Sequence, residues 1–366
     1  MQKQKKIAIV INDLAGGGAE KVMLTLATTL QQLGHHPHFF VLQKRGQYQV
    51  PAELPCHDCF DKNAKNIDGV FKRSQSAKIL KHKIEEVEVQ VGKFDLYLSN
   101  LDKTNLLMTK TGLSPLYCIV HNSIEEELKR QIKLGPIAYF KMLIAKKSLN
   151  NQNLVCVSDG IAHEILNQGR IKPKQVKTIY NPFAIESIRA AAEEPNEQMP
   201  KGDFLIHVGR VAKQKRHDIL FESLKMMKTN IPIVLLCSNA KKAVKLAKKH
   251  GVSERLIIPG FQPNPYAWIK RSKALVLSSD YEGLPTVLIE SLICGTPAVS
   301  TDCPHGPNEI LTNELSEYLV PVREPKILAE KTDALLQSNF QVKNAPIIEK
   351  VNAEAVAEEY LSLIKS

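Results

Sequence analysis

The chain has 366 residues, of which 43% are hydrophobic and 24% charged, with 18 glycines and 20 prolines. This length favours two domains with separate hydrophobic cores, and the composition excludes disordered, collagen-like and disulfide-scaffold proteins. The formal net charge of +11 indicates a preference for anionic ligands, whereas an aromatic content of only 6% argues against nucleic acid as a partner.

The apolar runs of the sequence are short. The longest, such as residues 231–237, fall well below the roughly 18 residues that a membrane-spanning helix needs. The run at residues 7–11 is too short for the core of a signal peptide. Seven scattered cysteines favour reduced thiols over a disulfide framework. We therefore expect a cytoplasmic protein.

The first half of the chain opens with a predicted strand at residues 6–12, a glycine loop at 16–18 and a helix at 19–33. Shorter apolar runs then alternate with helical patterns. These runs lack strict alternation of apolar and polar residues, which is typical of strands buried on both faces of a parallel sheet. The further strands predicted in this half are residues 37–42, 94–98, 116–120 and 153–157.

The second half repeats the same rhythm after a polar, proline-containing segment at residues 190–203, which we interpret as a linker. Its predicted strands are residues 204–208, 231–236, 256–258, 274–278, 298–300 and 318–320. Helical spacing near the end of the chain predicts a last helix at residues 352–366. The fold class is therefore α/β, with two doubly wound domains at residues 1–190 and 203–350.

The most informative motif lies at residues 278–291, where a buried strand ends and Pro285 and Thr286 mark the first turn of a helix. Open α/β sheets bind ligands at this edge, and the helix N-terminus there favours a phosphate. Glu282 and Glu290 flank that anion site, and carboxylates beside a phosphate make sense when they accept hydrogen bonds from a sugar or ribose. From physics alone, a helix charge and one solvated glutamate explain the pair equally well.

Two further loops follow the first strand of each half. Gly209 allows a close turn, and Arg210 and Lys215 are of the type that binds diphosphates, although basic residues in a loop are more often simply solvated. In the first half, the loop at residues 14–20 departs from the dinucleotide fingerprint G-x-G-x-x-G because Lys21 stands at its last glycine. A nicotinamide cofactor is therefore disfavoured. We expect instead that the backbone of the glycine turn approaches a phosphate or a sugar ring.

These motifs together resemble the retaining two-domain glycosyltransferases of the glycogen-synthase-like group, family four. The resemblance rests on the glycine loop 16–20, the loop 209–215, Phe261 after a Pro-Gly pair, and Glu282 and Glu290 in an E-x7-E arrangement. It spans nearly the whole chain. It implies the GT-B fold, in which two Rossmann-like domains face each other across a cleft, with the donor on the second, the acceptor on the first and the last helix crossing back.

The resemblance also implies roles for single residues. Arg210 and Lys215 would bind the donor diphosphate, Glu290 the ribose and Glu282 the hydroxyls of the sugar. His121, at the end of a predicted strand, matches the active-site histidine of the family. The other residues that the resemblance assigns to the donor are Gly17, Gly18, Phe261, Gln262, Gly283, Leu284, Pro285 and Thr286.

The reaction that the resemblance implies is a retaining, metal-independent transfer of a hexose, with glucose from UDP-glucose as our expected donor and no further cofactor. No Asp-x-Asp motif and no cluster with metal-ligand spacing occurs in the sequence. The expected acceptor is a saccharide on a glycan, glycopeptide, lipopolysaccharide or lipid carrier. Two alternatives remain open at this point: a nucleotide-sugar hydrolase or epimerase of the same fold, and a non-catalytic nucleotide-sugar-binding subunit.

Residues 125–150 combine apolar residues at helical spacing with six basic ones, and Gly135 and Pro136 break the pattern into two short helices. We expect the apolar stripe to pack on the sheet of the first domain, with the basic residues, Lys146 and Lys147 among them, solvated. The alternative is a weak, salt-sensitive contact with the inner face of an anionic membrane.

Overall fold

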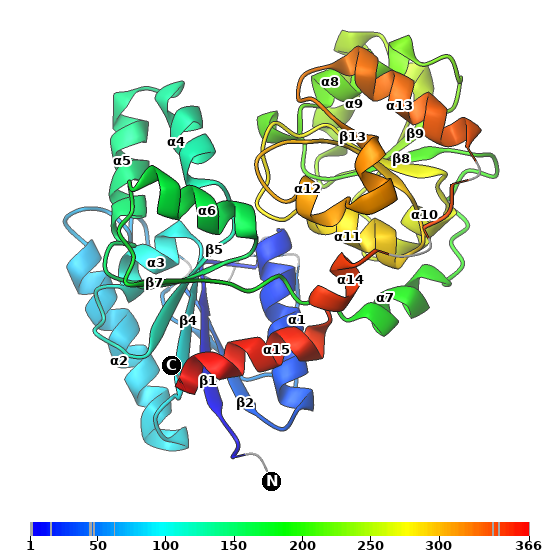
Figure 1. Cartoon of the computed structure of the whole chain (residues 1–366). Helices are drawn as coiled ribbons and strands as arrows, with labels where there is room; N and C mark the ends of the chain where they lie inside the picture. Colours follow the sequence, from blue (N-terminus) through cyan, green and yellow to red (C-terminus); the bar gives the residue numbers. More distant parts are fainter. Residues whose placement is uncertain are drawn as a thin grey trace. The chain divides into compact units, whose positions relative to one another are not determined.

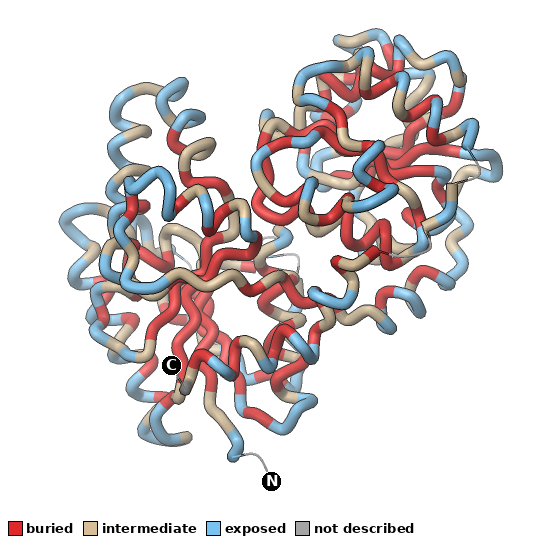
Figure 2. The backbone as a smooth tube through the Cα atoms, viewed as in Figure 1, coloured by how far each residue is buried: buried red, intermediate tan, exposed pale blue. Residues whose placement is uncertain are grey.

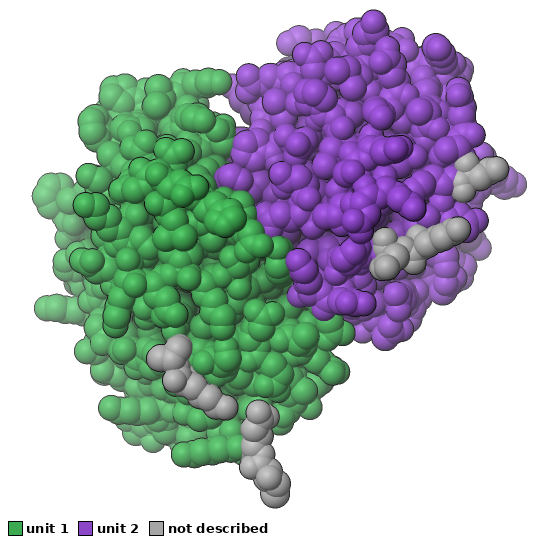
Figure 3. All heavy atoms as spheres, in the orientation of Figure 1, with its two compact units in different colours: residues 1–183, 351–366 green, residues 184–350 purple. Residues whose placement is uncertain are grey.

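The computed structural model describes residues 3–14, 17–43, 46, 48–61, 63–338, 340–342 and 345–365. The chain divides into two compact units (Figure 3). Unit 1 comprises residues 1–183 together with 351–366, and unit 2 comprises residues 184–350. The chain therefore passes from one unit to the other twice, after Phe183 and after Lys350.

Unit 1 is built on a parallel sheet that, in the described residues, has seven strands in the order β3-β2-β1-β4-β5-β6-β7 (Figure 1). Its strands are β1 (Lys6–Ile11), β2 (His36–Val41), β3 (Cys56–Asp58), β4 (Leu96–Asn100), β5 (Leu116–Val120), β6 (Asn153–Cys156) and β7 (Gln175–Thr178). Its helices are α1 (Gly18–Gln32), α2 (Arg73–Val91), α3 (Asp102–Met108), α4 (Ile124–Ile132), α5 (Pro136–Lys147), α6 (Asp159–Gln168) and α15 (Ala353–Ser362), followed by the 3₁₀ turn η4 (Leu363–Lys365).

Burial explains which strands of unit 1 the sequence reveals. Ile7, Ile9 and Ile11 of β1 have no exposed surface, as expected for a central strand covered on both faces. The edge strands β3 and β7 are short and polar, reading Cys-His-Asp and Gln-Val-Lys-Thr, and the sequence pattern did not predict them. An edge strand needs only one set of ladder hydrogen bonds and little apolar surface, so its sequence carries a weak signal.

Unit 2 repeats the architecture on a parallel sheet of six described strands in the order β10-β9-β8-β11-β12-β13. All six correspond to predicted strands. They are β8 (Leu205–Val208), β9 (Ile233–Leu236), β10 (Leu256–Gly260), β11 (Ala274–Leu277), β12 (Ala298–Thr301) and β13 (Leu319–Val320). The helices are α7 (Ile185–Ala192), α8 (His217–Met226), α9 (Ala240–His250), α10 (Tyr266–Arg271), α11 (Thr286–Ile293), α12 (Pro307–Ile310), α13 (Pro325–Gln337) and α14 (Ile347–Lys350), with 3₁₀ turns η1 (Lys213–Lys215), η2 (Ser253–Arg255) and η3 (Asn313–Tyr318).

The core of unit 2 lies between the sheet and the helices α8 and α13. Leu205, Val276 and Val299 contribute from neighbouring strands, and Phe221 and Leu328 contribute from the two helices. All five side chains are essentially inaccessible to solvent. In Figure 2 the strands of this sheet are mainly coloured as buried. This rigid base holds the loops at the carboxyl ends of β8 and β11 in place.

The linker predicted at residues 190–203 is misplaced, because the chain crosses between the units earlier, after Phe183. Helix α7 belongs to unit 2, where it packs against α10 and α11. Its alanines, which read as part of a polar linker, include the buried Ala192 beside the buried Ile188. The predicted last helix exists as α15 and packs on α1 in unit 1, where the Phe183 N–H donates to the Val351 carbonyl at 2.8 Å.

Across the described residues, every helix is too short or too polar to span a bilayer. The longest helix, α2, has 19 residues but carries lysines and glutamates along its length.

A histidine pair in unit 1, of which His38 is buried and His57 half-buried, makes stability depend on pH. His38 on β2 lies with its Nδ1 3.1 Å from Nε2 of His57 on β3, and the two rings stack. Burial, reinforced by the charge of His57, lowers the pKa of His38 from 6.5 to about 4. Between these two values the unfolded chain binds a proton that the folded chain does not, so stability falls as pH falls.

We therefore expect the wild-type free energy of unfolding to decrease from pH 7 to pH 5, and His38→Gln to reduce the steepness of that decrease. Equilibrium urea unfolding followed by circular dichroism at both pH values measures the effect. His163→Gln, at an exposed position on α6, is the control. An identical pH dependence in wild type and His38→Gln would contradict the assignment.

Candidate functional site

Each sheet has a switch point, which is a place between two neighbouring strands where the strand order reverses. From there the chain adds strands toward one edge of the sheet first and toward the other edge afterwards. In unit 2 the switch point lies between β8 and β11, and in unit 1 between β1 and β4. Ligands of open α/β sheets bind outside the carboxyl ends of the strands at such a point. The loops that follow β8 and β11 contain most of the residues that the sequence assigned to the donor.

The structure joins Lys215 and Glu282, which lie 67 positions apart in sequence. The Nζ atom of Lys215 donates to Oε1 of Glu282 at 2.8 Å, and the two side chains are only 16% and 9% exposed. Gln214, which the sequence analysis did not single out, donates to the Tyr281 carbonyl at 2.8 Å. A largely buried ammonium and carboxylate thus face each other at the switch point.

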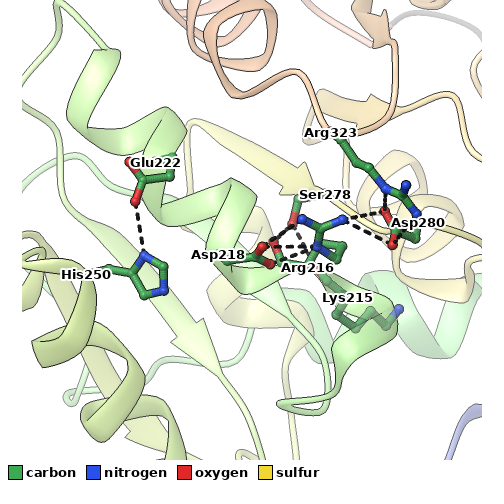
Figure 4. A network of polar contacts seen from close by, with 8 residues as sticks. All are labelled: Lys215, Arg216, Asp218, Glu222, His250, Ser278, Asp280 and Arg323. Carbon is green, nitrogen blue, oxygen red and sulfur yellow. Dashed lines mark hydrogen bonds and ion pairs between the residues drawn. The ribbon is translucent and has the colours of Figure 1, made fainter. Parts of the chain in front are cut away.

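An arginine next to Lys215 locks the two loops together (Figure 4). The Arg216 guanidinium donates to both carboxylate oxygens of Asp280 at 3.0 and 3.2 Å, and to Asp218 at 2.7–3.2 Å. Arg323, from the segment after β13, donates to the same Asp280 carboxylate at 3.0 and 3.1 Å. The Ser278 hydroxyl donates to the Lys215 carbonyl at 2.8 Å. Figure 4 shows the Lys215 side chain leaving this network in another direction.

The segment from Glu282 to Pro285 is buried and leads directly into α11. Its path depends on Gly306, whose φ is 95°; a Cβ atom there would come within 3.0 Å of the segment's backbone. The Glu282 N–H donates to the Pro304 carbonyl at 2.6 Å, and the His305 N–H donates back to the Glu282 carbonyl at 3.1 Å. The first N–H groups of α11, which have no partner within the helix, therefore start from a fixed position.

The remaining predicted donor residues of unit 2 lie at different depths. Glu290 is buried one turn into α11, and Arg210 is exposed in the loop after β8. Phe261, 45% exposed, and Gln262 follow β10, which is two strand positions from β8. The structure thus brings together Lys215, Glu282 and the start of α11, while Phe261 and Gln262 belong to the edge of the same sheet.

In unit 1, the predicted glycines and His121 lie at carboxyl ends of strands. Gly17 precedes α1, and a Cβ atom there would clash with the Glu20 carboxylate, which folds back over the helix start. Gly18 is the first residue of α1. Gly16, which also belongs to the predicted glycine loop, lies outside the described residues.

His121 follows β5, and its Nε2 lies 3.0 Å from Oδ1 of Asn100 at the end of β4. Burial lowers the pKa of His121 to about 4, so the ring is neutral at pH 7. Because an amide oxygen only accepts hydrogen bonds, Nε2 carries the proton and Nδ1 is the acceptor. His121 lines a small cavity of about 50 Å³ with Asp102, Glu127 and Lys146.

Lys146 of α5 corrects an expectation, because it is buried rather than solvated. Its Nζ donates to both oxygens of Asp102 at 2.7 and 2.8 Å and to Glu127 at 2.5 Å. Despite the cost of burial, these two carboxylates raise the pKa of Lys146. Its neighbour Lys147 is exposed, as expected. Spacing alone did not distinguish the two lysines, since the carboxylates come from other helices.

No group of three or more potential metal ligands is present in the part of the chain that the structure describes.

Comparison with known proteins matches two segments of the chain to two glycosyltransferase families. Residues 16–187 match Glycosyltransferase Family 4, and residues 189–354 match Glycosyl transferases group 1. Over 339 residues the chain is 24% identical to the N-acetylgalactosamine-N,N'-diacetylbacillosaminyl-diphospho-undecaprenol 4-alpha-N-acetylgalactosaminyltransferase of Campylobacter jejuni, covering 92% of this chain and 91% of that one. It is 29% identical to the lipopolysaccharide 1,6-galactosyltransferase of Salmonella typhimurium, over 45% of this chain and 47% of that one.

Solved structures agree on the fold. Anabaena Alr3699/HepE in complex with UDP and glucose superposes with a TM-score of 0.78 at 15% identity, covering 99% of this chain and 100% of that one. The lipopolysaccharide outer core galactosyltransferase WaaB gives 0.68 at 20% identity, covering 98% and 99%. The two Rossmann-like units are those of a GT-B glycosyltransferase. This chain is a glycosyltransferase with a family 4 domain followed by a group 1 domain.

The contrast between Lys146 and Lys147 is testable. Lys146→Met leaves two partly buried carboxylates without their ammonium, so we expect a loss of about 2–4 kcal/mol of unfolding free energy. Lys147→Met, on the exposed side of the same turn, is expected to change it by less than about 0.5 kcal/mol. Urea unfolding measures both, and equal effects of the two substitutions would contradict the buried ion pair.

Proposed function

We propose that this glycosyltransferase transfers a hexose from a UDP-sugar, with UDP-glucose as the favoured donor, to a saccharide acceptor with retention of configuration and without a metal ion. The observation that carries the proposal is the Lys215–Glu282 pair at the switch point of unit 2. It offers one ammonium for a phosphate and one carboxylate for sugar hydroxyls beside a helix N-terminus. The likeness to a protein that binds UDP and glucose supports the choice of donor.

In the proposed mechanism, the transition state is stabilised mainly by neutralising the negative charge that develops on the leaving diphosphate. Lys215 and Arg210 bind the diphosphate together with the N–H groups at the start of α11, where Gly283 to Thr286 approach it closely. Glu282 accepts hydrogen bonds from the transferred sugar, and Glu290 from the ribose. The acceptor hydroxyl attacks on the face that the diphosphate leaves, and a phosphate oxygen takes its proton.

Phe261 and Gln262 are proposed to read the base through their backbone, and Gly17 and Gly18 to leave room for a phosphate or sugar ring. His121 is proposed to bind a hydroxyl group, because its neutral ring presents Nδ1 as an acceptor while its Nε2–H donates a hydrogen bond to Oδ1 of Asn100. The acceptor class is proposed from relatives whose names state a lipopolysaccharide or an undecaprenol-linked saccharide.

A donor screen tests this function. Purified protein is incubated with UDP-, GDP- and ADP-sugars, and thermal shift and release of nucleotide are measured with and without saccharide, glycopeptide and lipid-linked acceptors. Mass spectrometry of the products then shows whether a sugar was transferred. Release of UDP that no acceptor accelerates would point to a hydrolase, and binding without turnover would point to a non-catalytic subunit.

Substitutions at the central pair test its role in activity and in stability. Glu282→Gln keeps an oxygen that accepts from Lys215, so we expect the melting temperature to change little while kcat/KM falls about 100- to 1,000-fold. Lys215→Ala should lower kcat/KM similarly and should also cost about 1–3 kcal/mol of unfolding free energy, because the buried Glu282 carboxylate loses its donor.

Lys213→Ala, at an exposed position in the same 3₁₀ turn, is the matched control and should keep both properties. Near-normal kcat/KM in Glu282→Gln and Lys215→Ala would remove the pair from the donor site.

Metal independence is tested separately. Because Lys215, Arg210 and the start of α11 are proposed to supply the positive charge, saturating EDTA should leave initial rates within about twofold of the untreated enzyme. Loss of activity in EDTA that magnesium or manganese restores would refute this part of the mechanism.

A further inference from the structure

Helices α4 and α5 of unit 1 leave an apolar face uncovered. Ile137 is 86% exposed and Phe140 is 58% exposed, although both are large hydrophobic side chains. In Figure 2 the tube over the two helices is mainly pale blue and tan. The exposed apolar residues of this hairpin face are Ile132, Leu134, Ile137, Phe140 and Ile144.

This exposure corrects the expectation that the stripe packs on the sheet of unit 1. Helix α5 contacts α3 and α4, and its one fully buried side chain is Lys146, in the ion pair described above. Ile137, Phe140 and Ile144, three and four positions apart, lie on one side of α5. A buried lysine with an apolar residue facing outward is the reverse of the usual amphipathic arrangement, so burial within unit 1 does not explain the stripe.

The charge around the hairpin face is positive. No acidic residue occurs from position 128 to position 158, whereas the same stretch contains Lys129, Arg130, Lys133, Lys141, Lys146 and Lys147. Three of these lysines lie beside carboxylates: Lys129 pairs with Glu126, Lys146 with Glu127 and Asp102, and Lys141 lies 3.7 Å from Asp68. Glu125 pairs with Arg170, outside this stretch. Lys133 and Lys147, at opposite ends of the hairpin, are exposed.

We propose that the hairpin face docks on an anionic lipid bilayer, with its apolar side chains entering the interface and its basic residues meeting the head groups. Helices that lie in a membrane interface typically bind it through apolar side chains flanked by lysine and arginine. A second copy of the chain fits less well, because a symmetric contact through this face would bring the same basic residues together. Docking does not depend on which sugar the enzyme transfers.

The hairpin face lies near the residues of unit 1 that are proposed to bind the acceptor. Helix α4 begins three residues after His121, at the carboxyl edge of the unit 1 sheet. Its nine residues make α4 about 14 Å long. A bilayer at the hairpin face would therefore lie close to the loops of unit 1 that carry the proposed acceptor-side residues.

Vesicle binding tests the proposal with the full chain. In co-sedimentation we expect binding to vesicles of phosphatidylcholine mixed with phosphatidylglycerol, little binding to phosphatidylcholine alone, and release near 0.5 M NaCl, where the Debye length falls to about 4 Å. Equal binding to neutral and anionic vesicles, or none to either, would overturn the proposal. Sedimentation without vesicles would instead reveal self-association.

Substitutions locate the surface. Each lysine near an anionic membrane contributes about 1 kcal/mol, about fivefold in partitioning, so Lys133→Glu with Lys147→Glu should weaken binding at least about 25-fold. The matched control is Lys241→Glu with Lys245→Glu, at exposed positions on the basic helix α9 of unit 2. Loss of binding in the α9 variant but not in the hairpin variant would overturn the assignment.

Insertion is tested separately from adsorption. Ile137→Asp should weaken binding, whereas Val89→Asp, 87% exposed on α2, should not. The chain has one tryptophan, Trp268, which is buried, so Phe140→Trp adds an exposed probe. Its emission should shift to shorter wavelength on anionic vesicles, after subtraction of the wild-type signal. An unshifted emission with vesicles bound would contradict insertion.

Discussion

The Asp280 carboxylate fixes the geometry on which the site of unit 2 depends. It accepts from Arg216 on the β8 side and from Arg323 on the segment after β13, so three separate stretches of chain meet at one group. With Arg216 held there, the preceding residue, Lys215, faces Glu282. Only this arrangement turns two loops at a switch point into a single site with one positive and one negative side chain.

Unit 1 uses the same device at the corresponding edge of its own sheet. Lys146 holds two carboxylates from different helices, as Arg216 holds Asp218 and Asp280 in unit 2. In both units a cation with two partners fixes loops that the parallel sheet alone does not position. Partly buried charges are costly unless they are paired, so such clusters specify one loop arrangement rather than many. They leave the neighbouring groups, His121 and Lys215, in defined positions.

Sequence patterns predicted the central strands of both sheets but not these clusters. Central strands of both units were predicted because burial on two faces requires continuous apolar runs, whereas the polar edge strands β3 and β7 gave no such signal. The candidate residues Lys215 and Glu282 were found through the motifs around them, and the structure brings them together.

Other residues of the two sites could not be found from the sequence. Arg216 was not recognised, because an arginine in a basic loop reads as solvated and its partner Asp280 is 64 positions away. The sequence pattern also predicted the opposite of what the structure has for Lys146, which is buried, and for the apolar residues of the hairpin face, which are exposed. The elements that pack around a short helix decide which of its faces is buried. The periodicity of that one helix carries no information about those elements.

The return of the chain to unit 1 has a consequence for biosynthesis. Residues 184–350 form unit 2 without interruption, while unit 1 is completed only by α15, which packs on α1 and joins Phe183 through backbone hydrogen bonds. A ribosome therefore releases all of unit 2 before unit 1 has its final helix. Unit 2 is the part that is ready to fold on its own, and the face of α1 that α15 covers stays open until the last of these segments emerges.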